Sequence, residues 1–243
     1  MSAKYTQMTD ALHNYVIGQR TNANDPLMAA LQADTESMGD LAQMAISPDQ
    51  GGLISLLVGL IGAKWALEVG TFTGASSICI ARYLLPGGKL FCFDQDFKST
   101  SIARRYWIKA GLQDRIDLRL GDAHRLLPHF KPQNLLDFVF IDADKEGYDF
   151  YYETLLPYVR TGGLILFDNM LRGGQVIDPI LKNTPPVRAI DQLNRKLAAD
   201  NRVHSCLIPI ADGLVVCRKL FTAGHEGRRL GTDSRRMPGE SRF

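Results

Sequence analysis

From Trp65 onward the chain alternates short apolar segments, which predict strands, with longer amphipathic segments, which predict helices. The predicted strands are WALEVG, KLFCFD, RIDLRL, LLDFVFID and GGLILFDN, and the predicted helices include GASSICIARYLL, KSTSIARRYWIKAG, GYDFYYETLLPYV and VRAIDQLNRKLAAD. This alternation predicts a mostly parallel sheet with helices on both faces. The final segment, RVHSCLIPIADGLVVCRK, predicts two strands joined at Asp212 and Gly213, so that the last strand runs antiparallel.

Residues 1–62 carry helix signals ahead of the first strand. Asp25 can cap a helix whose first residue is a proline. Ser47 is placed in the same way before Pro48, and Gln50 would complete a capping box with it. These residues therefore predict a group of N-terminal helices.

Length and composition fit one domain at residues 1–221. The chain has 243 residues, of which 45% are hydrophobic, and this suffices for a sizeable core. Residues 222–243 contain five arginines, three acidic residues and few apolar ones. Such a composition cannot bury enough apolar surface to fold, so we expect this tail to be disordered.

Charge and composition also restrict the partners. The net charge is +2 and the tail accounts for it, which leaves a nearly neutral domain and predicts no nucleic-acid surface. The sequence has no apolar run of bilayer length and no signal-peptide core, so we expect a cytoplasmic protein without a membrane partner. Widely spaced cysteines and unpaired histidines argue against zinc.

A glycine turn follows the first predicted strand, in LEVGTFTGASS. Gly70 and Gly74 let the backbone approach a ligand closely. A dinucleotide-binding turn needs a further glycine where this chain has Phe72, whose side chain would crowd a pyrophosphate. The turn therefore suits a nucleoside without phosphates better than NAD.

Two acids accompany this turn. Asp94 ends the second strand, where a carboxylate can accept hydrogen bonds from both ribose hydroxyls. Glu68, near the end of the first strand, could face the positive end of a ligand. The alternative for Glu68 is a buried acid paired with a helix amide.

Charged and polar residues also follow the fourth and fifth strands. Asp142 and Asp168 end these strands, and Asn169 follows at once. If the two strands are neighbours, the three side chains supply hard oxygen ligands for Mg²⁺, Mn²⁺ or Ca²⁺. The alternative is turn formation and helix capping by Asp168 and Asn169.

In combination these motifs resemble a known family. MAISPDQGGLISLLVGLIGAKWALEVGTFTGASS, FDQD, GDA, FIDADKEGY and LFDNMLRGG are similar to the cation-dependent O-methyltransferases, the group of the caffeoyl-coenzyme A and catechol O-methyltransferases, with bacterial members closest. The resemblance covers residues 28–219. It implies the class I S-adenosylmethionine-dependent methyltransferase fold, which is Rossmann-like, with a seven-stranded sheet whose last strand is antiparallel. It also implies a homodimer, with residues 1–62 contributing to the dimer and to the acceptor site.

The resemblance implies a role for each matching residue. S-adenosylmethionine would be bound by Met44, Glu68, Gly70, Ser76, Asp94, Ala123 and Asp142. A divalent metal, Mg²⁺ before Mn²⁺ or Ca²⁺, would be held by Asp142, Asp168 and Asn169. Lys145 matches the catalytic base, with Asp142 beside it, and Asp144 would lie near the acceptor. Ala75 and Gly52 depart from the family pattern, which usually has larger residues at both positions.

The implied reaction is methyl transfer to a hydroxyl of a phenolic acceptor, such as a catechol, with adjacent hydroxyls. For Lys145 the alternative is an ion pair with Asp144 or Asp149. Two other functions compete with methyl transfer: an NAD-dependent oxidoreductase, which Phe72 and the final hairpin oppose, and a non-catalytic binding protein on the same fold. The identity of the acceptor is not encoded in these motifs.

Overall fold

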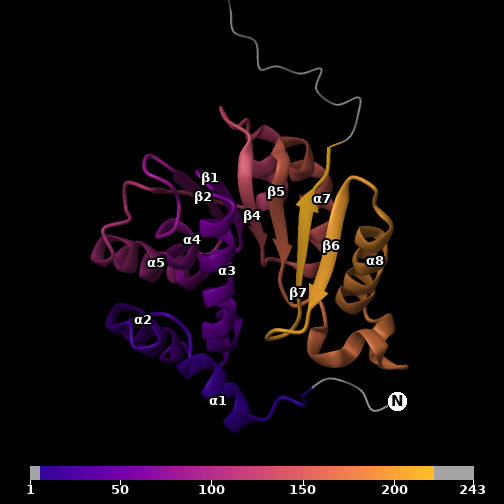
Figure 1. The fold of residues 1–243 in the computed structure, drawn as a ribbon, viewed down its shortest axis with the longest axis horizontal. Helices are drawn as coiled ribbons and strands as arrows, with labels where there is room; N and C mark the ends of the chain where they lie inside the picture. The colour runs from indigo at the N-terminus through magenta and orange to yellow at the C-terminus, as the bar shows by residue number, and fades with distance from the viewer. Residues whose placement is uncertain (1–5, 222–243) are drawn as a thin grey trace, which may run out of the picture.

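Seven strands form one sheet, in the order β3-β2-β1-β4-β5-β7-β6, in the computed structural model, which describes residues 6–221. The strands are β1 (Trp65–Val69), β2 (Lys89–Asp94), β3 (Ile116–Leu120), β4 (Leu136–Ile141), β5 (Val159–Phe167), β6 (Val203–Ile208) and β7 (Leu214–Lys219). β7 is antiparallel to both β5 and β6, whereas the other neighbours pair in parallel (Figure 1). The predicted sheet is confirmed, and the prediction for 222–243 lies outside the described residues.

Helices cover both faces of this sheet. The α-helices are α1 (Asp10–Gly18), α2 (Pro26–Glu36), α3 (Pro48–Leu60), α4 (Ala75–Ala81), α5 (Phe97–Lys109), α6 (Ala123–Leu126), α7 (Tyr148–Leu155) and α8 (Pro185–Ala199). The 3-10 helices are η1 (Gly39–Met44), η2 (Leu127–His129), η3 (Lys145–Gly147), η4 (Leu156–Tyr158), η5 (Arg172–Ile177) and η6 (Leu181–Asn183). None of the helices in residues 6–221 has both the length and the apolar character needed to span a membrane.

Two hydrophobic cores result, one on each face. Helices α7 and α8 pack on one face, and α2 to α5 pack on the other. β4 separates the cores: Val139 and Ile141 enter the first, and Phe138 and Phe140 enter the second. Each fully buried side chain of this size stabilises the fold by about 1.5–3 kcal/mol. Burial on both faces explains why all six residues of β4 are buried, as is usual in a parallel sheet.

The predicted starts of α2 and α3 are confirmed, but one predicted capping interaction is wrong. Asp25 caps α2, and its Oδ1 accepts hydrogen bonds from the amides of Leu27 and Met28 at 2.9 and 3.3 Å. Ser47 is the N-cap residue of α3, but its hydroxyl bonds to Asp49 instead of a backbone amide. Gln50 is buried, with 1% of its surface exposed, so the predicted capping box is wrong.

The carboxyl ends of the parallel strands define one edge of the sheet. In Figure 1 these strand arrows point toward the lower edge of the view, and the β7 arrow points the opposite way. Helix α1 and the segment that follows β5 lie at the same lower end. In open sheets of this kind, ligands bind in the crevice outside these strand ends.

Candidate active site

The glycine turn after β1 is fixed by contact with the end of β4. Gly70 has φ +86°, and a Cβ added there would lie 1.9 Å from the carbonyl oxygen of Asp142. Gly74 has φ +88°, and its added Cβ would lie 2.8 Å from Nε1 of Trp107. Both positions therefore require glycine, both for backbone conformation and for space. The predicted donor turn and the predicted metal strand are in direct contact.

Asp94 holds this turn in place. Its Oδ2 accepts hydrogen bonds from the amides of Thr71 and Phe72 at 2.8 and 2.9 Å, and its Oδ1 accepts one from Asp96 at 2.8 Å. Carboxylate oxygens can accept more than one hydrogen bond, so these contacts leave Asp94 able to bind a hydroxyl. They also orient the carboxylate toward the turn.

Glu68 lies fully buried beneath the start of α4. Its carboxylate accepts hydrogen bonds from the Ser77 hydroxyl and the Cys92 thiol, and its Oε1 has no partner. Burial raises the pKa of Glu68 to about 7, and the hydroxyls of Ser76 and Ser77 partly offset this rise. Glu68 is thus a buried acid that pairs with side-chain hydroxyls, and Ser76 belongs to the same cluster.

Asp142 and Asp168 directly follow β4 and β5, and these two strands are paired, so the condition for bringing the two carboxylates together is met. Asp168 has 3% of its surface exposed, and one of its oxygens accepts the Asn169 amide at 2.6 Å. Burial raises the pKa of Asp168 to about 7, and the nearby charge of Asp142 adds to the rise. Asn169 adopts φ +56°, a conformation that asparagine tolerates better than most residues.

Lys145 joins this pair of carboxylates. Its Nζ lies 2.9 Å from Oδ1 of Asp142 and 2.6 Å from the Tyr148 hydroxyl. The Tyr148 hydroxyl donates to the carbonyl oxygen of Asp168 at 3.1 Å. Burial raises the pKa of Tyr148 well above its usual value, and the charges of Asp142 and Asp168 act in the same direction. Tyr148 was not predicted, because nothing in its local sequence indicates these contacts.

The alternative ion pairs of Lys145 are wrong. Asp149 pairs with Lys196. Asp144 accepts a hydrogen bond from Tyr151, and its other oxygen lies 3.2 Å from Nε2 of His124. With 55% of its side chain exposed, Asp144 faces the solvent at the rim of the predicted site.

The two remaining predicted residues lie at the ends of short helices. Met44 ends η1 and is 54% exposed. Ala123 begins α6, which Asp122 caps by accepting the His124 amide at 2.9 Å. Neither residue contacts the carboxylate cluster through a hydrogen bond, so their cofactor roles stay predictions.

Gln50 is a site residue that the sequence assigned to another role. Its side-chain amide faces the carboxylate of Asp168 and acts to lower the pKa of that carboxyl. Its Nε2 is buried and makes no hydrogen bond of good geometry. A buried polar group without a hydrogen-bond partner destabilises the fold. We therefore interpret Gln50 as a residue that positions the carboxylate of Asp168.

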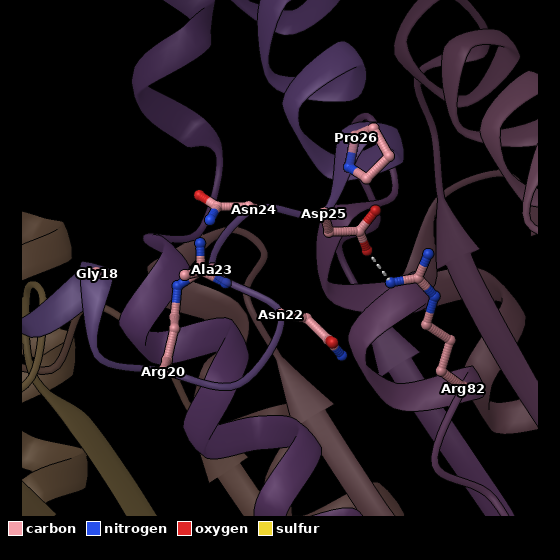
Figure 2. A pocket seen from close by; sticks show the side chains of 8 residues that line it. All are labelled: Gly18, Arg20, Asn22, Ala23, Asn24, Asp25, Pro26 and Arg82. Atoms are coloured by element: carbon pink, nitrogen blue, oxygen red, sulfur yellow. Dashed lines mark hydrogen bonds and ion pairs between the residues drawn. The ribbon is translucent and has the colours of Figure 1, made fainter.

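Two hollows lie among the N-terminal segments and α4. One, of about 680 Å³, is lined by Arg20, Asn22, Asp25 and Arg82, with an ion pair between Asp25 and Arg82 (Figure 2). The other, of about 1340 Å³, runs between the N-terminal helices, α4 and Ile210. Neither is lined by a residue predicted to bind the donor or the metal or to act as the base, but residues 1–62, which we expect to contribute to the acceptor site, form most of the lining of both. We place the site at the strand ends, because the acids and the lysine that can do chemistry gather there.

Residues 6–221 contain no cluster of three or more histidine, cysteine, aspartate or glutamate side chains suited to a metal. The predicted metal ligands, two carboxylates and one amide, do not form such a cluster. They are nonetheless all hard oxygen donors.

Comparison with known proteins agrees with the predicted fold and family. A model of the O-methyltransferase family matches residues 19–220. The caffeoyl-CoA O-methyltransferase of Petroselinum crispum is 33% identical over 224 residues, covering 87% of this chain and 92% of that protein. Two bacterial structures superpose closely. TomG of Streptomyces achromogenes, an O-methyltransferase involved in tomaymycin synthesis and solved in complex with SAM, has a TM-score of 0.79 at 27% identity, covering 88% of this chain and 100% of TomG.

The second structure is the O-methyltransferase of Bacillus cereus in complex with SAH. It has a TM-score of 0.77 at 32% identity, and the match covers 86% of this chain and 97% of that one. The predicted Rossmann-like fold and the predicted family are both confirmed. The chain belongs to the O-methyltransferase family.

Proposed function

We propose that the protein transfers a methyl group from S-adenosylmethionine to a hydroxyl of a phenolic acceptor with adjacent hydroxyls. Family membership supports O-methyl transfer. The donor is supported by the SAM and SAH bound to TomG and to the Bacillus cereus enzyme. The acceptor class is supported by relatives named for caffeoyl-CoA.

We propose that Asp142, Asp168 and Asn169 hold a divalent cation, Mg²⁺ before Mn²⁺ or Ca²⁺. The chemistry of the three side chains fits: two carboxylates and an amide are oxygen donors. The raised pKa of Asp168 reflects a buried negative charge beside Asp142, which a cation would relieve. A cation bound there would supply a lower pKa for a coordinated acceptor hydroxyl.

Lys145 is the residue best placed to accept the proton of that hydroxyl. It is mostly buried, with 12% of its side chain exposed, and it contacts Asp142. Before it can accept a proton, Lys145 must lose its own proton, and the contact with Asp142 is then no longer an ion pair. Tyr148 holds the lysine nitrogen from the other side, so the amine keeps its position in the site. Asp144, at the rim, faces the entering acceptor.

The donor end is assigned to the glycine turn and its neighbours. Gly70 and Ser76 would approach the donor, Asp94 would bind its ribose hydroxyls, and the free Oε1 of Glu68 would accept a hydrogen bond. Met44 and Ala123 would flank the bound molecule. Holding donor and acceptor in line can lower the barrier by about 7–11 kcal/mol in well-aligned cases, and this is the main contribution we assign to the fold.

One observation carries the proposal: the contact between Gly70 and the carbonyl of Asp142. It brings the turn that suits a nucleoside next to the carboxylates that suit a metal-chelating acceptor. An NAD-dependent enzyme would need room for a pyrophosphate at the same turn, which a glycine provides. This chain has Phe72 at that position, with φ +49°. We therefore favour methyl transfer.

Calorimetric titration with S-adenosylmethionine is the first test, with NAD as the control ligand. Saturable binding of S-adenosylmethionine alone, followed by methylation of a catechol that stops with EDTA and returns with Mg²⁺, is the expected result. Binding of NAD, or an absence of S-adenosylmethionine binding by folded protein, would overturn the proposal.

We also propose a homodimer that uses the N-terminal region. Leu56 and Leu60 on α3 are 64% and 76% exposed. Tyr83 and Leu85 are also exposed, and they adjoin α3 and its end, because added Cβ atoms at Gly59 and Gly62 would lie 3.8 and 3.7 Å from them. Exposed apolar side chains gathered in this way are typical of a protein interface.

A further inference from the structure

The two hollows among the N-terminal segments and α4 adjoin each other. The smaller, of about 680 Å³, and the larger, of about 1340 Å³, share five lining residues: Arg20, Asn22, Ala23, Asp25 and Arg82. We call the combined space the N-terminal hollow. It is large enough for a small molecule, since most ligand pockets have volumes of about 300–1,000 Å³.

The middle of the N-terminal hollow is apolar. Helices α3 and α4 are in contact there, because a Cβ added at Gly51 would lie 3.0 Å from Sγ of Cys79 and 3.4 Å from Cδ1 of Ile46. Side chains of α2 and α3 that belong to the second hydrophobic core also line the hollow: Met28, Leu31 and Leu53. This part therefore suits the apolar body of a ligand.

Gly52 keeps the hollow open beside Arg20. A Cβ added at Gly52 would lie 3.7 Å from Cδ and 3.9 Å from Cβ of Arg20, so the stem of the arginine lies where a longer side chain at position 52 would extend. Ala75 on α4 lines the same hollow. Both positions depart from the family pattern toward smaller residues, so the space is larger in this chain than that pattern predicts.

Arg20 brings an uncompensated positive charge to one end of the hollow. Its Nε is buried and has no hydrogen-bond partner. Within residues 6–221, no carboxylate lies within ion-pair distance of its guanidinium. Arg82 also lines this end, but it is paired with Asp25 (Figure 2). One net positive charge therefore remains at the Arg20 end.

The other acids of the hollow have partners or lie toward its far end. Asp49 accepts the Ser47 hydroxyl at 2.6 Å and lies 3.4 Å from Nε2 of His13. Asp10 is at the start of α1, and Arg20 follows the end of that helix. Glu36 ends α2, about 16 Å from the start of the helix at 1.5 Å per residue. A bound anion would thus be favoured at the Arg20 end alone.

The terminal segments of the chain do not match this charge. Residues 1–5 contain Lys4 and no acid, and residues 222–243 have five arginines against three acids. Like charges repel, so neither segment complements Arg20. Leu56 and Tyr83, at the edge of the hollow, also belong to the surface proposed for the dimer. A partner subunit there would shield a ligand in the hollow from water.

We propose that the N-terminal hollow binds an apolar monocarboxylate, with its carboxylate on Arg20 and its apolar body against α2 and α3. One net positive charge matches a monoanion, and a planar carboxylate matches the fork of a guanidinium. The inference does not rest on the proposed function, because the residues assigned to the donor, the metal and the base do not line the hollow.

The test is calorimetric titration with octanoate, and with neutral 1-octanol of the same chain length. EDTA is present and S-adenosylmethionine is left out, so that the metal site cannot hold the carboxylate. The wild type should bind octanoate more tightly than octanol. Acetate, which has the carboxylate without the apolar body, should give no measurable binding.

Two variants separate the carboxylate end from the apolar part. Arg20→Met keeps the length of the side chain and should weaken octanoate binding by roughly ten- to hundredfold, the usual effect of losing a charged hydrogen bond, while octanol binding stays the same. Gly52→Leu fills the hollow beside Arg20 and should weaken the binding of both compounds. Leucine favours a helix more than glycine does, so α3 should remain intact.

Arg104→Met, at an exposed position of α5, is the matched control and should bind both compounds like the wild type. If Arg20→Met does not unfold cooperatively, Arg20→Gln takes its place. The proposal is wrong if the wild type binds octanoate no more tightly than octanol, or if either folded variant binds octanoate with wild-type affinity. None of these results bears on methyl transfer, which the titration with S-adenosylmethionine tests separately.

Discussion

Nζ of Lys145 lies 2.9 Å from Oδ1 of Asp142, and the Tyr148 hydroxyl holds the same nitrogen at 2.6 Å. The lysine that we assign as the base is thus paired with a carboxylate that we assign to the metal.

Lys145→Met removes the proposed proton acceptor without changing the length of the side chain greatly. We expect kcat to fall by about a hundred- to ten-thousandfold, the usual contribution of general base catalysis. The affinity for S-adenosylmethionine, measured by calorimetry, should stay the same. Lys98→Met, at an exposed position of α5, is the control, and a Lys145→Met enzyme with wild-type kcat would exclude Lys145 as the base.

Asp142→Ala should abolish metal-dependent methyl transfer while the protein stays folded. The contact of Asp142 with Gly70 is made by its backbone carbonyl, which alanine retains. We expect Mg²⁺ binding to be lost in calorimetry and thermal unfolding to remain cooperative. Asp149→Ala removes a carboxylate from the nearby surface, where it pairs with Lys196, and should keep both properties. Wild-type activity in Asp142→Ala would contradict the metal assignment.

Gln50→Met tests whether the buried amide positions Asp168. Without the amide, the Asp168 carboxylate loses a neighbour that favours its charged form. We expect Mg²⁺ affinity to fall by about ten- to a hundredfold, as for other groups that orient a metal ligand. Gln113→Met, exposed in the turn before β3, serves as the control. If the two variants bind Mg²⁺ with equal affinity, Gln50 does not position Asp168 and only fills space in the core.

Glu68 should make the stability of the protein depend on pH. Its pKa rises on folding from 4.5 to about 7, so the folded state binds a proton more tightly than the unfolded state. The contribution to stability is complete below pH 4.5 and is lost as the pH rises to 7. It amounts to about 3 kcal/mol, to order of magnitude.

Glu68→Gln should remove this dependence, because glutamine keeps an oxygen for the Ser77 hydroxyl but does not titrate. Urea unfolding at several pH values between 4.5 and 7.5 measures the effect as the difference between wild type and variant. Taking the difference matters, because Asp168 has a pKa raised to about 7 as well and changes stability in the same direction. Parallel curves for the two proteins would mean that Glu68 is already ionised in the folded state.

Leu60→Glu tests the dimer. We expect the wild type to sediment as a dimer at micromolar concentration and the variant as a monomer, because a charge would be buried at the apolar surface of α3. Ile108→Glu changes a residue of α5 that is similarly exposed, at 64%, and should remain dimeric. A wild type that sediments as a monomer would contradict the proposal directly.

Much of the fold follows from patterns that are local in sequence. The β4 segment is apolar throughout because both of its faces are buried, and the start of α2 follows from Asp25 and Pro26. The sequence placed Asp142 and Asp168 at two strand ends, but it left open whether β4 and β5 are neighbours, which the sheet order shows.

The contacts within the site were less predictable, because they join residues far apart in the chain. Gln50 has the spacing of a capping box, but its side chain turns inward to Asp168, 118 positions later in the sequence. His124 and Tyr151 approach Asp144 from α6 and α7. Spacing along one helix cannot reveal such contacts, which depend on how separate elements pack.

Gly70 rests on the carbonyl of Asp142 with no room for a methyl group between them. The distance between the two halves of the site is therefore set by the pairing of β1 with β4, not by any flexible hinge. In the proposed function, the loops around the acceptor could vary without disturbing the alignment of donor and acceptor, because the sheet would set that alignment. An engineer who wishes to change acceptor preference should alter those loops and leave this backbone contact intact.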